Sequence, residues 1–216
     1  MAQQRISSSF DFDEDLFAEY LEAKDRSLNK RDALFYASVM GVVFACWICG
    51  CIAVGSVNAV GIVVGAIIAA LLAFSVFIAL TGRTILWPKA AWRKTYQRFF
   101  TRHGVDSSEA RPWSFACRTS ATPNHLEVSV LHDGEPTSTI TKSYKEFSHI
   151  EQTDHLIVVV AACEVEPVWK SLFSPDYADL LAKREATEDA VFMKGSLKGM
   201  NESELIDYLG RKVRIR

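Results

Sequence analysis

Three of the five cysteines lie close together, and their spacing is the first pattern that could carry chemistry. Cys46 and Cys49 form a CxxC pair, and Cys51 follows two residues later. In redox enzymes such a pair sits at a helix start, where the local field depresses the thiol pKa. Here the three lie inside an uncharged apolar stretch without a cation that would stabilise a thiolate. We therefore interpret them as small packing residues and keep metal or redox chemistry as the weaker alternative.

The histidines do not follow a metal-binding or catalytic spacing. None of the five lies four residues from a second ligand on a helix, and no HExxH motif occurs. His149 and His155 flank a predicted turn and could meet Glu151 or Asp154, but we favour polar strand ends over a site. The sequence also lacks a GxSxG motif, a phosphate-binding glycine loop and a Rossmann fingerprint. We expect no catalytic residues, no cofactor, no metal and no enzyme activity.

Other reactive side chains are interpreted as structural. Cys117 and Cys163 fall on predicted strands of a cytoplasmic domain, where thiols stay reduced, so we expect both in the core. Five carboxylates indicate a solvated surface helix. They are Asp176, Asp179, Glu185, Glu188 and Asp189.

An apolar run separates the two ends of the chain. Between Asp32 and Arg83 there is no Asp, Glu, Lys, Arg or His. As one helix, this run would measure about 75 Å, whereas the hydrocarbon core of a bilayer is about 30 Å thick. We predict a transmembrane hairpin over residues 33–82, with helices at about 33–54 and 59–82 and a break at the turn-prone residues 55–58. A buried helix pair of a soluble protein would keep a polar face, which these segments lack.

The distribution of Lys and Arg predicts the topology. Residues 83–104 carry 6 basic and no acidic residues, four more basic residues lie between Lys24 and Arg31, and the turn is uncharged. Positively charged flanks stay on the cytoplasmic side. We therefore expect a multi-pass protein of the cell membrane, the inner membrane in a bacterium, with both termini in the cytoplasm.

The same basic segment predicts the partners. The net charge of −2 divides into −3 for residues 1–32, +6 for residues 83–104 and −5 for residues 105–216. The basic part suits anionic lipid headgroups, and the acidic part argues against nucleic acid. Trp and Tyr also prefer the headgroup level, so we place Tyr96, Phe99 and Phe100 there with the basic residues around them. The candidate membrane-interface residues are Arg83, Trp87, Lys89, Trp92, Arg93 and Lys94.

Small residues recur every four positions along both predicted spans, which is typical of close helix packing. The candidate helix-packing residues are Gly41, Ala45, Cys49, Gly61, Gly65 and Ala69. The two strips could face each other within the hairpin, which we favour, or one could join two protomers in a homo-oligomer. Neither span holds an ionisable group, which argues against a proton relay.

The polar segments complete an α+β membrane protein. Residues 1–32 are expected to hold an amphipathic helix capped near Asp13, packed on protein rather than on the membrane surface. Residues 83–104 are expected to form a basic juxtamembrane helix. Alternating strands over 114–162, an Asp133–Gly134 turn, a helix at 175–185, a strand at 190–194 and a helix at 202–213 predict an antiparallel sheet domain over 105–216.

This arrangement resembles the YcxB-like family of small bacterial membrane proteins. The similar pieces are residues 13–17 before a basic entry at Lys30 and Arg31, residues 126–130, residues 143–150, and residues 192–195 ahead of the last helix. Met193–Lys194 stands where the family tends to have Pro–Lys, and residues 168–189 resemble an insertion. The resemblance implies the hairpin-plus-sheet architecture, closed by a helix in a shape similar to a pleckstrin-homology domain, and supplies no functional residues.

Together these observations predict a membrane-anchored cytoplasmic module that binds or regulates an unidentified protein or a lipid. The alternatives are a subunit of a membrane complex or small transporter and, ranked lower, an enzyme with a site that carries no recognisable motif.

Overall fold

The computed structural model describes residues 6–55, 58–82, 93–106, 108, 110–162 and 188–213. These residues divide into two compact units. The sheet domain contains the described residues up to Lys24 and from 93 onward, and the helix hairpin contains the described residues of 25–82. The protein is thus α+β, with two long apolar helices and antiparallel sheets, as the sequence predicts.

A five-stranded antiparallel sheet forms one layer of the sheet domain. Its strands lie in the order β4-β3-β2-β1-β8. Their bounds are β1 Ile6–Asp13, β2 Ser114–Ala121, β3 His125–His132, β4 Glu135–Ser143 and β8 Leu197–Lys198. The predicted tight turn joins β3 to β4, where Asp133 and Gly134 both have positive φ (52° and 84°).

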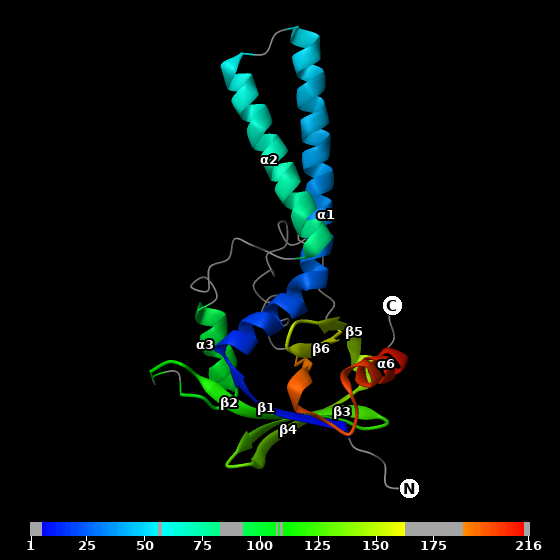
Figure 1. Ribbon diagram of the computed structural model, residues 1–216. Coiled ribbons are helices and arrows are strands. Elements are labelled where there is room, and N and C mark those ends of the chain that lie inside the picture. Colours follow the sequence, from blue (N-terminus) through cyan, green and yellow to red (C-terminus); the bar gives the residue numbers. More distant parts are fainter. Residues whose placement is uncertain are drawn as a thin grey trace. The chain divides into compact units, whose positions relative to one another are not determined.

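The first strand is the main correction to the sequence-based expectation. Residues 6–13 were predicted to precede or begin a helix, yet they form β1, which pairs with β2 from Ile6↔Ala121 to Asp13↔Ser114. Figure 1 shows β1 beside β2 although residues 14–113 separate them in the sequence. The membrane-type helices are therefore inserted between two neighbouring strands of one sheet.

A single helix, α1 (Glu14–Val54), follows β1. The predicted cap is confirmed, since the Asp13 carboxylate accepts a hydrogen bond from the Leu16 N–H at 2.8 Å. Phe17, Tyr20 and Ala23 are buried in the sheet domain, so this end of α1 packs on protein, as expected. No break separates this amphipathic end from the apolar end, because no Gly or Pro occurs before Gly41.

A smaller antiparallel sheet consists of β5 (Phe147–Gln152), β6 (Leu156–Ala161) and β7 (Ala190–Met193). Every residue of β6 is buried. Leu156, Val158 and Val160 pack with α1 and with α3 (Arg93–Arg102), whereas the alternate β6 residues pack with the last helix, α6 (Glu202–Lys212). Both faces of β6 are covered, which is why it shows no polar alternation.

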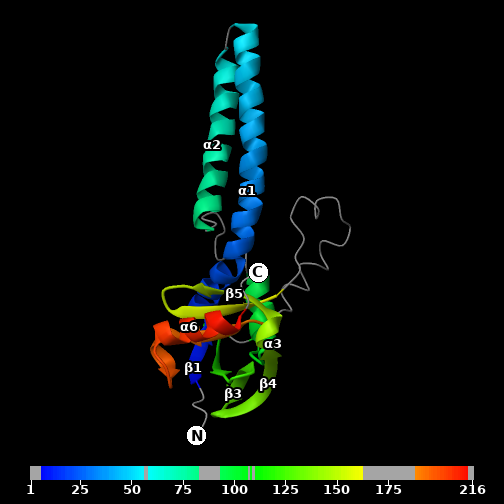
Figure 2. The same cartoon turned by 90° about the vertical axis from the view of Figure 1, so that its right-hand side faces the viewer.

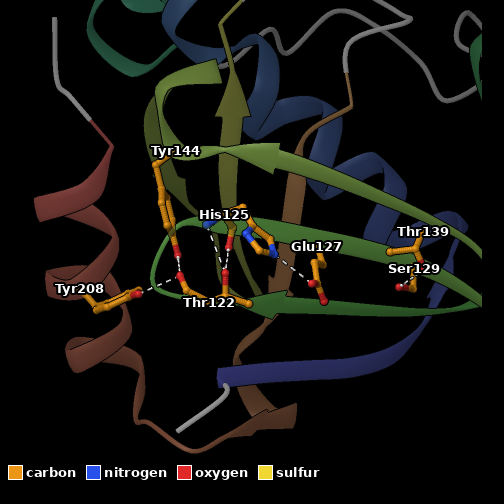
Figure 3. Close-up of polar contacts among 7 residues, drawn as sticks. All are labelled: Thr122, His125, Glu127, Ser129, Thr139, Tyr144 and Tyr208. Atoms are coloured by element: carbon orange, nitrogen blue, oxygen red, sulfur yellow. Dashed lines mark hydrogen bonds and ion pairs between the residues drawn. The ribbon is translucent and has the colours of Figure 1, made fainter. Parts of the chain in front are cut away.

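The predicted C-terminal helix is present, and tyrosine hydrogen bonds connect it to the rest of the sheet domain. α6 begins with a capping box formed by Asn201 and Glu204 and lies beside β5 in both views (Figures 1 and 2). Tyr208 of α6 and Tyr144 of the short 3-10 helix η2 (Tyr144–Glu146) both donate to the Thr122 carbonyl oxygen, at 3.0 and 2.6 Å. Figure 3 shows the two hydroxyls converging on the β2–β3 turn. The same view shows the cross-strand hydrogen bond between Ser129 and Thr139, at 2.9 Å.

The hairpin consists of the second part of α1 and of α2 (Ala59–Thr81), which run side by side (Figure 2). Asn58 caps α2 by accepting from the Gly61 N–H at 2.8 Å, and Gly82 ends it in the left-handed conformation (φ 71°). Asn29–Val54 and Ala59–Thr81 are long and apolar enough to cross a membrane. In their most apolar 18-residue stretches only 0% and 6% of residues are buried, which is the opposite of a core helix in a soluble protein.

Candidate functional site

A cavity of about 270 Å³ lies within the sheet domain, on the inner face of the five-stranded sheet. Its floor follows the strand register from β1 to β4: Phe12 pairs with Phe115, Cys117 with Val130, and Val130 with Ser138. Side chains at alternate positions of a strand point to one face, which explains why these residues share the floor. Val128 and its partner Ile140 extend the floor toward the β4 edge.

The walls of the cavity come from three other elements. Tyr20 of α1 and Phe99 of α3 close the aromatic end, and Val191 of β7 faces the aliphatic end. Arg102, Ser138 and Glu188 add polar groups to the lining. The result is a largely apolar pocket with few polar groups, the usual character of a small-molecule site, although its volume is at the small end.

His103 belongs to the aromatic wall. Its ring stacks on Phe115, with centroids 4.4 Å apart and an angle of 16°, and meets Phe99 edge-on at 4.7 Å. Burial lowers the pKa of His103 to about 4, with the nearby Arg102 charge adding to the effect. The imidazole is therefore neutral at neutral pH and offers one N–H donor and one nitrogen acceptor.

Cys117 also lines the cavity, beside the histidine wall. Burial raises the pKa of its thiol to about 11, against a hydrogen bond with Thr119 that lowers it. A nucleophilic cysteine needs a thiolate, which its surroundings must favour. Cys117 is therefore a packing residue that stays protonated, as the sequence predicts for a core position. Cys163 lies outside the described residues.

A buried ion pair supports one wall of the cavity. The Asp189 carboxylate, whose side chain is fully buried, accepts from Tyr20 Oη at 2.5 Å and from the Ala161 N–H at 2.7 Å, and it pairs with Lys24 Nζ at 2.9 Å. The carboxylate was expected on a solvated helix, and this expectation is wrong. Asp189 joins α1 to the strands β6 and β7, and its partners are 28 to 169 residues away, which no local pattern reveals.

The aromatic residues of α3 correct a second expectation. Tyr96 and Phe100 were placed at the lipid headgroups, yet they are 3% and 0% exposed and belong to the core of the sheet domain, with Phe99 packed against them. Of the candidate membrane-interface residues, Arg93 and Lys94 form the first turn of α3. The others, Arg83, Trp87, Lys89 and Trp92, lie outside the described residues, as does the helix expected at 175–185.

The small-residue strips differ between the two spans. Gly65 of α2 is buried, and a Cβ atom there would collide with the Trp47 ring of α1. Gly61 and Ala69 are half-buried on the same strip. On α1, by contrast, Ala45 and Cys49 are exposed and a Cβ on Gly41 would meet nothing within 4 Å. The small-residue strip of α2 therefore packs against Trp47 of α1 and not against the small-residue strip of α1.

The histidines expected near a turn have different partners. His155 Nδ1 donates to the Glu19 carboxylate of α1 at 2.9 Å, and Glu19 also accepts from the His155 backbone N–H at 2.7 Å. His149 Nε2 lies 3.9 Å from Glu151, too far for a hydrogen bond. Within the described part of the chain, no group of three or more His, Cys, Asp or Glu side chains could hold a metal ion.

Comparisons with protein-family models, with curated proteins and with solved structures find no match to this chain.

The sequence did not predict the cavity residues, because they share no motif. Catalytic motifs are recognised by fixed spacing, whereas this lining combines seven separate segments. One signal was present, namely the alternation of Ile6, Ser8, Phe10 and Phe12 with outward polar residues, which predicts a half-buried strand. Recognising that strand would have placed Phe12 on the inner face of the sheet.

Proposed function

We propose that this chain is a membrane-anchored cytoplasmic binding module. The hairpin crosses the membrane twice, both termini lie in the cytoplasm, and the sheet domain binds a small molecule in its cavity. Membership of the YcxB-like family and a pleckstrin-homology-like strand arrangement are parts of this proposal. They rest on the short motifs quoted above and on the two antiparallel sheets closed by α6.

The pairing of β1 with β2 is the observation that carries the topology. β1 precedes the first apolar helix and β2 follows the second, and eight residues of each strand pair in one sheet. Two flanks that belong to one folded sheet must lie on the same side of any membrane that the hairpin crosses. The excess of Lys and Arg on both flanks then selects the cytoplasmic side.

The cavity supports binding rather than catalysis. Its two reactive side chains, Cys117 and His103, are held in their neutral forms by burial. Neither is poised as a nucleophile or base near neutral pH. What remains is an apolar pocket with a polar mouth, which suits recognition of a small molecule. Anionic lipid headgroups are expected to contact basic residues of the segment 83–104.

Cysteine accessibility tests the topology. In a chain whose native cysteines are replaced by serine or alanine, single cysteines are introduced at Ser56, within the turn that the sequence predicts at 55–58, and at Thr141, which is exposed on β4. A membrane-impermeant maleimide added to intact cells should label the Ser56→Cys chain only. The Thr141→Cys chain should react only after the membrane is opened. Labelling of Thr141→Cys in intact cells would overturn the proposed orientation.

A second candidate function, as a subunit of a larger membrane assembly, is favoured by the exposed strip on α1. Cys49 and Ala45 lie on that strip and are exposed, which leaves them available to another helix. Oxidation of membranes that contain a chain with Cys49 as its sole cysteine should then yield a disulfide-linked dimer. A chain with Cys51 alone is the matched control, because a spacing of two residues places Cys51 on the opposite side of the helix from Cys49. Equal yields from the two chains would exclude a dimer through this strip.

A further inference from the structure

The cavity in the sheet domain is aromatic at one end and aliphatic at the other, and this division identifies the class of its ligand. We propose that the cavity binds an uncharged planar aromatic molecule of about two fused rings, with one polar substituent that hydrogen-bonds to His103. This proposal rests on the proposed function, which requires only that some small molecule occupies the cavity.

The volume sets the size of the ligand. An apolar cavity of about 150 Å³ in another protein holds one benzene molecule. The cavity here measures about 270 Å³, so it accommodates a molecule somewhat larger than one ring and smaller than most drug-sized ligands. A naphthalene-sized ring system fits this range, and so does an alkyl chain of similar volume, so the walls must decide between the two.

The walls favour a ring. Phe12 and Phe115 are stacked, with centroids 5.5 Å apart and an angle of 2°, and Phe99 lies 5.2 Å from Phe12. Tyr20 meets Phe12 edge-on at 6.0 Å. This cluster presents ring faces and edges to the cavity, and aromatic pairs attract beyond the effect of buried area. A rigid ring also loses no internal rotation on binding, whereas an alkyl chain must be ordered.

The polar groups favour an uncharged ligand with one hydrogen-bonding substituent. Arg102 contributes a positive charge to the lining and Glu188 a negative one, while Asp189 is already paired with Lys24. These charges balance, so the cavity selects neither a cation nor an anion. Among the described residues, no side chain or backbone group hydrogen-bonds to the ring nitrogens of His103, which leaves a donor and an acceptor for a ligand.

Two probes of similar volume test the inference on the full chain in phosphatidylcholine nanodiscs. These are 2-naphthol, which has two rings and a hydroxyl, and 1-octanol, which has a hydroxyl on an alkyl chain. Methyl NMR follows the signals of Val128, Val130, Ile140 and Val191, all of which line the cavity. We expect 2-naphthol to produce saturable ring-current shifts of these methyl groups and to bind at least about five-fold more tightly than 1-octanol.

A matched pair of variants separates the cavity from the surrounding lipid. Ser138→Trp places a large side chain at the cavity mouth from the edge strand β4. Thr141→Trp places the same side chain on the opposite face of that strand. The first variant should weaken 2-naphthol binding about ten-fold or more, and the second should leave it unchanged. A third variant, His103→Phe, should abolish the preference for 2-naphthol over naphthalene, because only the hydrogen bond is removed from a ring that still stacks.

The outcomes distinguish the two proposals. Tighter binding of 1-octanol than of 2-naphthol, or equal binding of the two, would overturn the aromatic assignment and leave the proposed function standing. If neither probe shifts the cavity methyl groups, the aromatic assignment falls together with the small-molecule part of the proposed function, and the proposed topology is tested separately by cysteine accessibility. A preference for 2-naphthol that is lost in Ser138→Trp and kept in Thr141→Trp establishes the inference.

Discussion

The hairpin and the sheet domain dispose their apolar residues in opposite ways. In the sheet domain, the apolar and aromatic side chains gather in the core, where Phe17, Tyr20 and Phe100 are buried. In the hairpin, large apolar side chains such as Ile52, Val60 and Leu80 are 69–76% exposed. The helix α1 takes part in both, because its first residues are core residues and its last residues face outward. One continuous helix can therefore fit two surroundings when its apolar residues form a stripe along one part and cover the whole circumference along the other.

The largest effect is expected from removing the parts of the sheet domain that lie outside residues 105–216, which are β1, the start of α1 and α3. The fragment 105–216, which the sequence marks as a separate domain, lacks β1 and the core residues Phe12, Phe17, Tyr20 and Phe100. We expect this fragment to show no cooperative unfolding transition in urea, followed by circular dichroism, because the five-stranded sheet loses an inner strand.

The control restores β1, the start of α1 and α3 without the apolar helix pair of the hairpin. A chain in which residues 1–30 are joined to residues 91–216 by a flexible Gly/Ser linker should unfold cooperatively. A cooperative transition for the fragment 105–216 alone would contradict the placement of β1 inside the sheet.

The buried ion pair is expected to give the next largest effect. Asp189→Ala removes the buried carboxylate that pairs with Lys24 and that accepts hydrogen bonds from Tyr20 Oη and from the Ala161 N–H. Breaking a buried pair from one side costs about 3–5 kcal/mol of unfolding free energy. Urea unfolding of the full chain in detergent, followed by near-ultraviolet circular dichroism, measures this change in the sheet domain.

The neighbouring residue provides the control. Glu188→Ala removes a half-buried carboxylate one position away, and we expect it to change the unfolding free energy by less than about 0.5 kcal/mol. Equal losses in the two variants would show that the ion pair does not stabilise the domain.

Within the hairpin, the two small-residue strips are expected to respond differently. Gly65→Leu collides with the Trp47 ring, whereas Gly41→Leu meets open space. We expect Gly65→Leu to destabilise helix packing by about 2 kcal/mol and Gly41→Leu to change it by less than about 0.5 kcal/mol. The ¹⁹F NMR signal of a 5-fluorotryptophan at position 47 reports the contact. A shift of that signal in Gly41→Leu, without one in Gly65→Leu, would reverse the assignment.

The smallest effect concerns the exposed contact between Glu19 of α1 and His155. The pKa of His155 is raised above its ordinary 6.5, chiefly by the hydrogen bond to Glu19 and next by the charge of that carboxylate. Burial alone would raise the pKa of Glu19, but hydrogen bonds from Thr153 and His155 outweigh it and lower the pKa below 4.5.

These directions define a pH window. The contribution of His155 is complete below pH 6.5 and is lost as the pH rises through its raised pKa, and the contribution of Glu19 is lost as the pH falls through its lowered pKa. The pair is therefore most stabilising between about pH 4.5 and 6.5. In an NMR titration, Glu19→Gln should return the His155 pKa toward 6.5, and Asp154→Asn should lower it less. An unchanged His155 pKa in Glu19→Gln would contradict the contact.

The sequence predicts the features that depend on local pattern and misses those that depend on pairing. Residues 33–82 lack any charge, and β3 and β4 alternate around an Asp–Gly turn, so both were predictable. The placement of β1 beside β2 and of Asp189 beside Lys24 depends on residues that are about 100 or more positions apart. The aromatic residues of α3 show the limit most clearly. Rings among basic residues suit a lipid surface and a protein core equally, and only the sheet beneath them decides.

The apolar helix pair interrupts one sheet between β1 and β2, and cross-linking across these two strands tests this placement most directly. Ser9 and Arg118 are partners in the strand register, and both are exposed. Paired strands hold Cα atoms within the range of a disulfide. In a full-length chain without native cysteines, but with a protease site near Asp106, mild oxidation of Ser9→Cys with Arg118→Cys should keep the two fragments joined after cleavage. Ser9→Cys with Thr141→Cys should leave them separate, because β4 lies three strands from β1. Separate fragments from the Ser9–Arg118 pair would contradict the account.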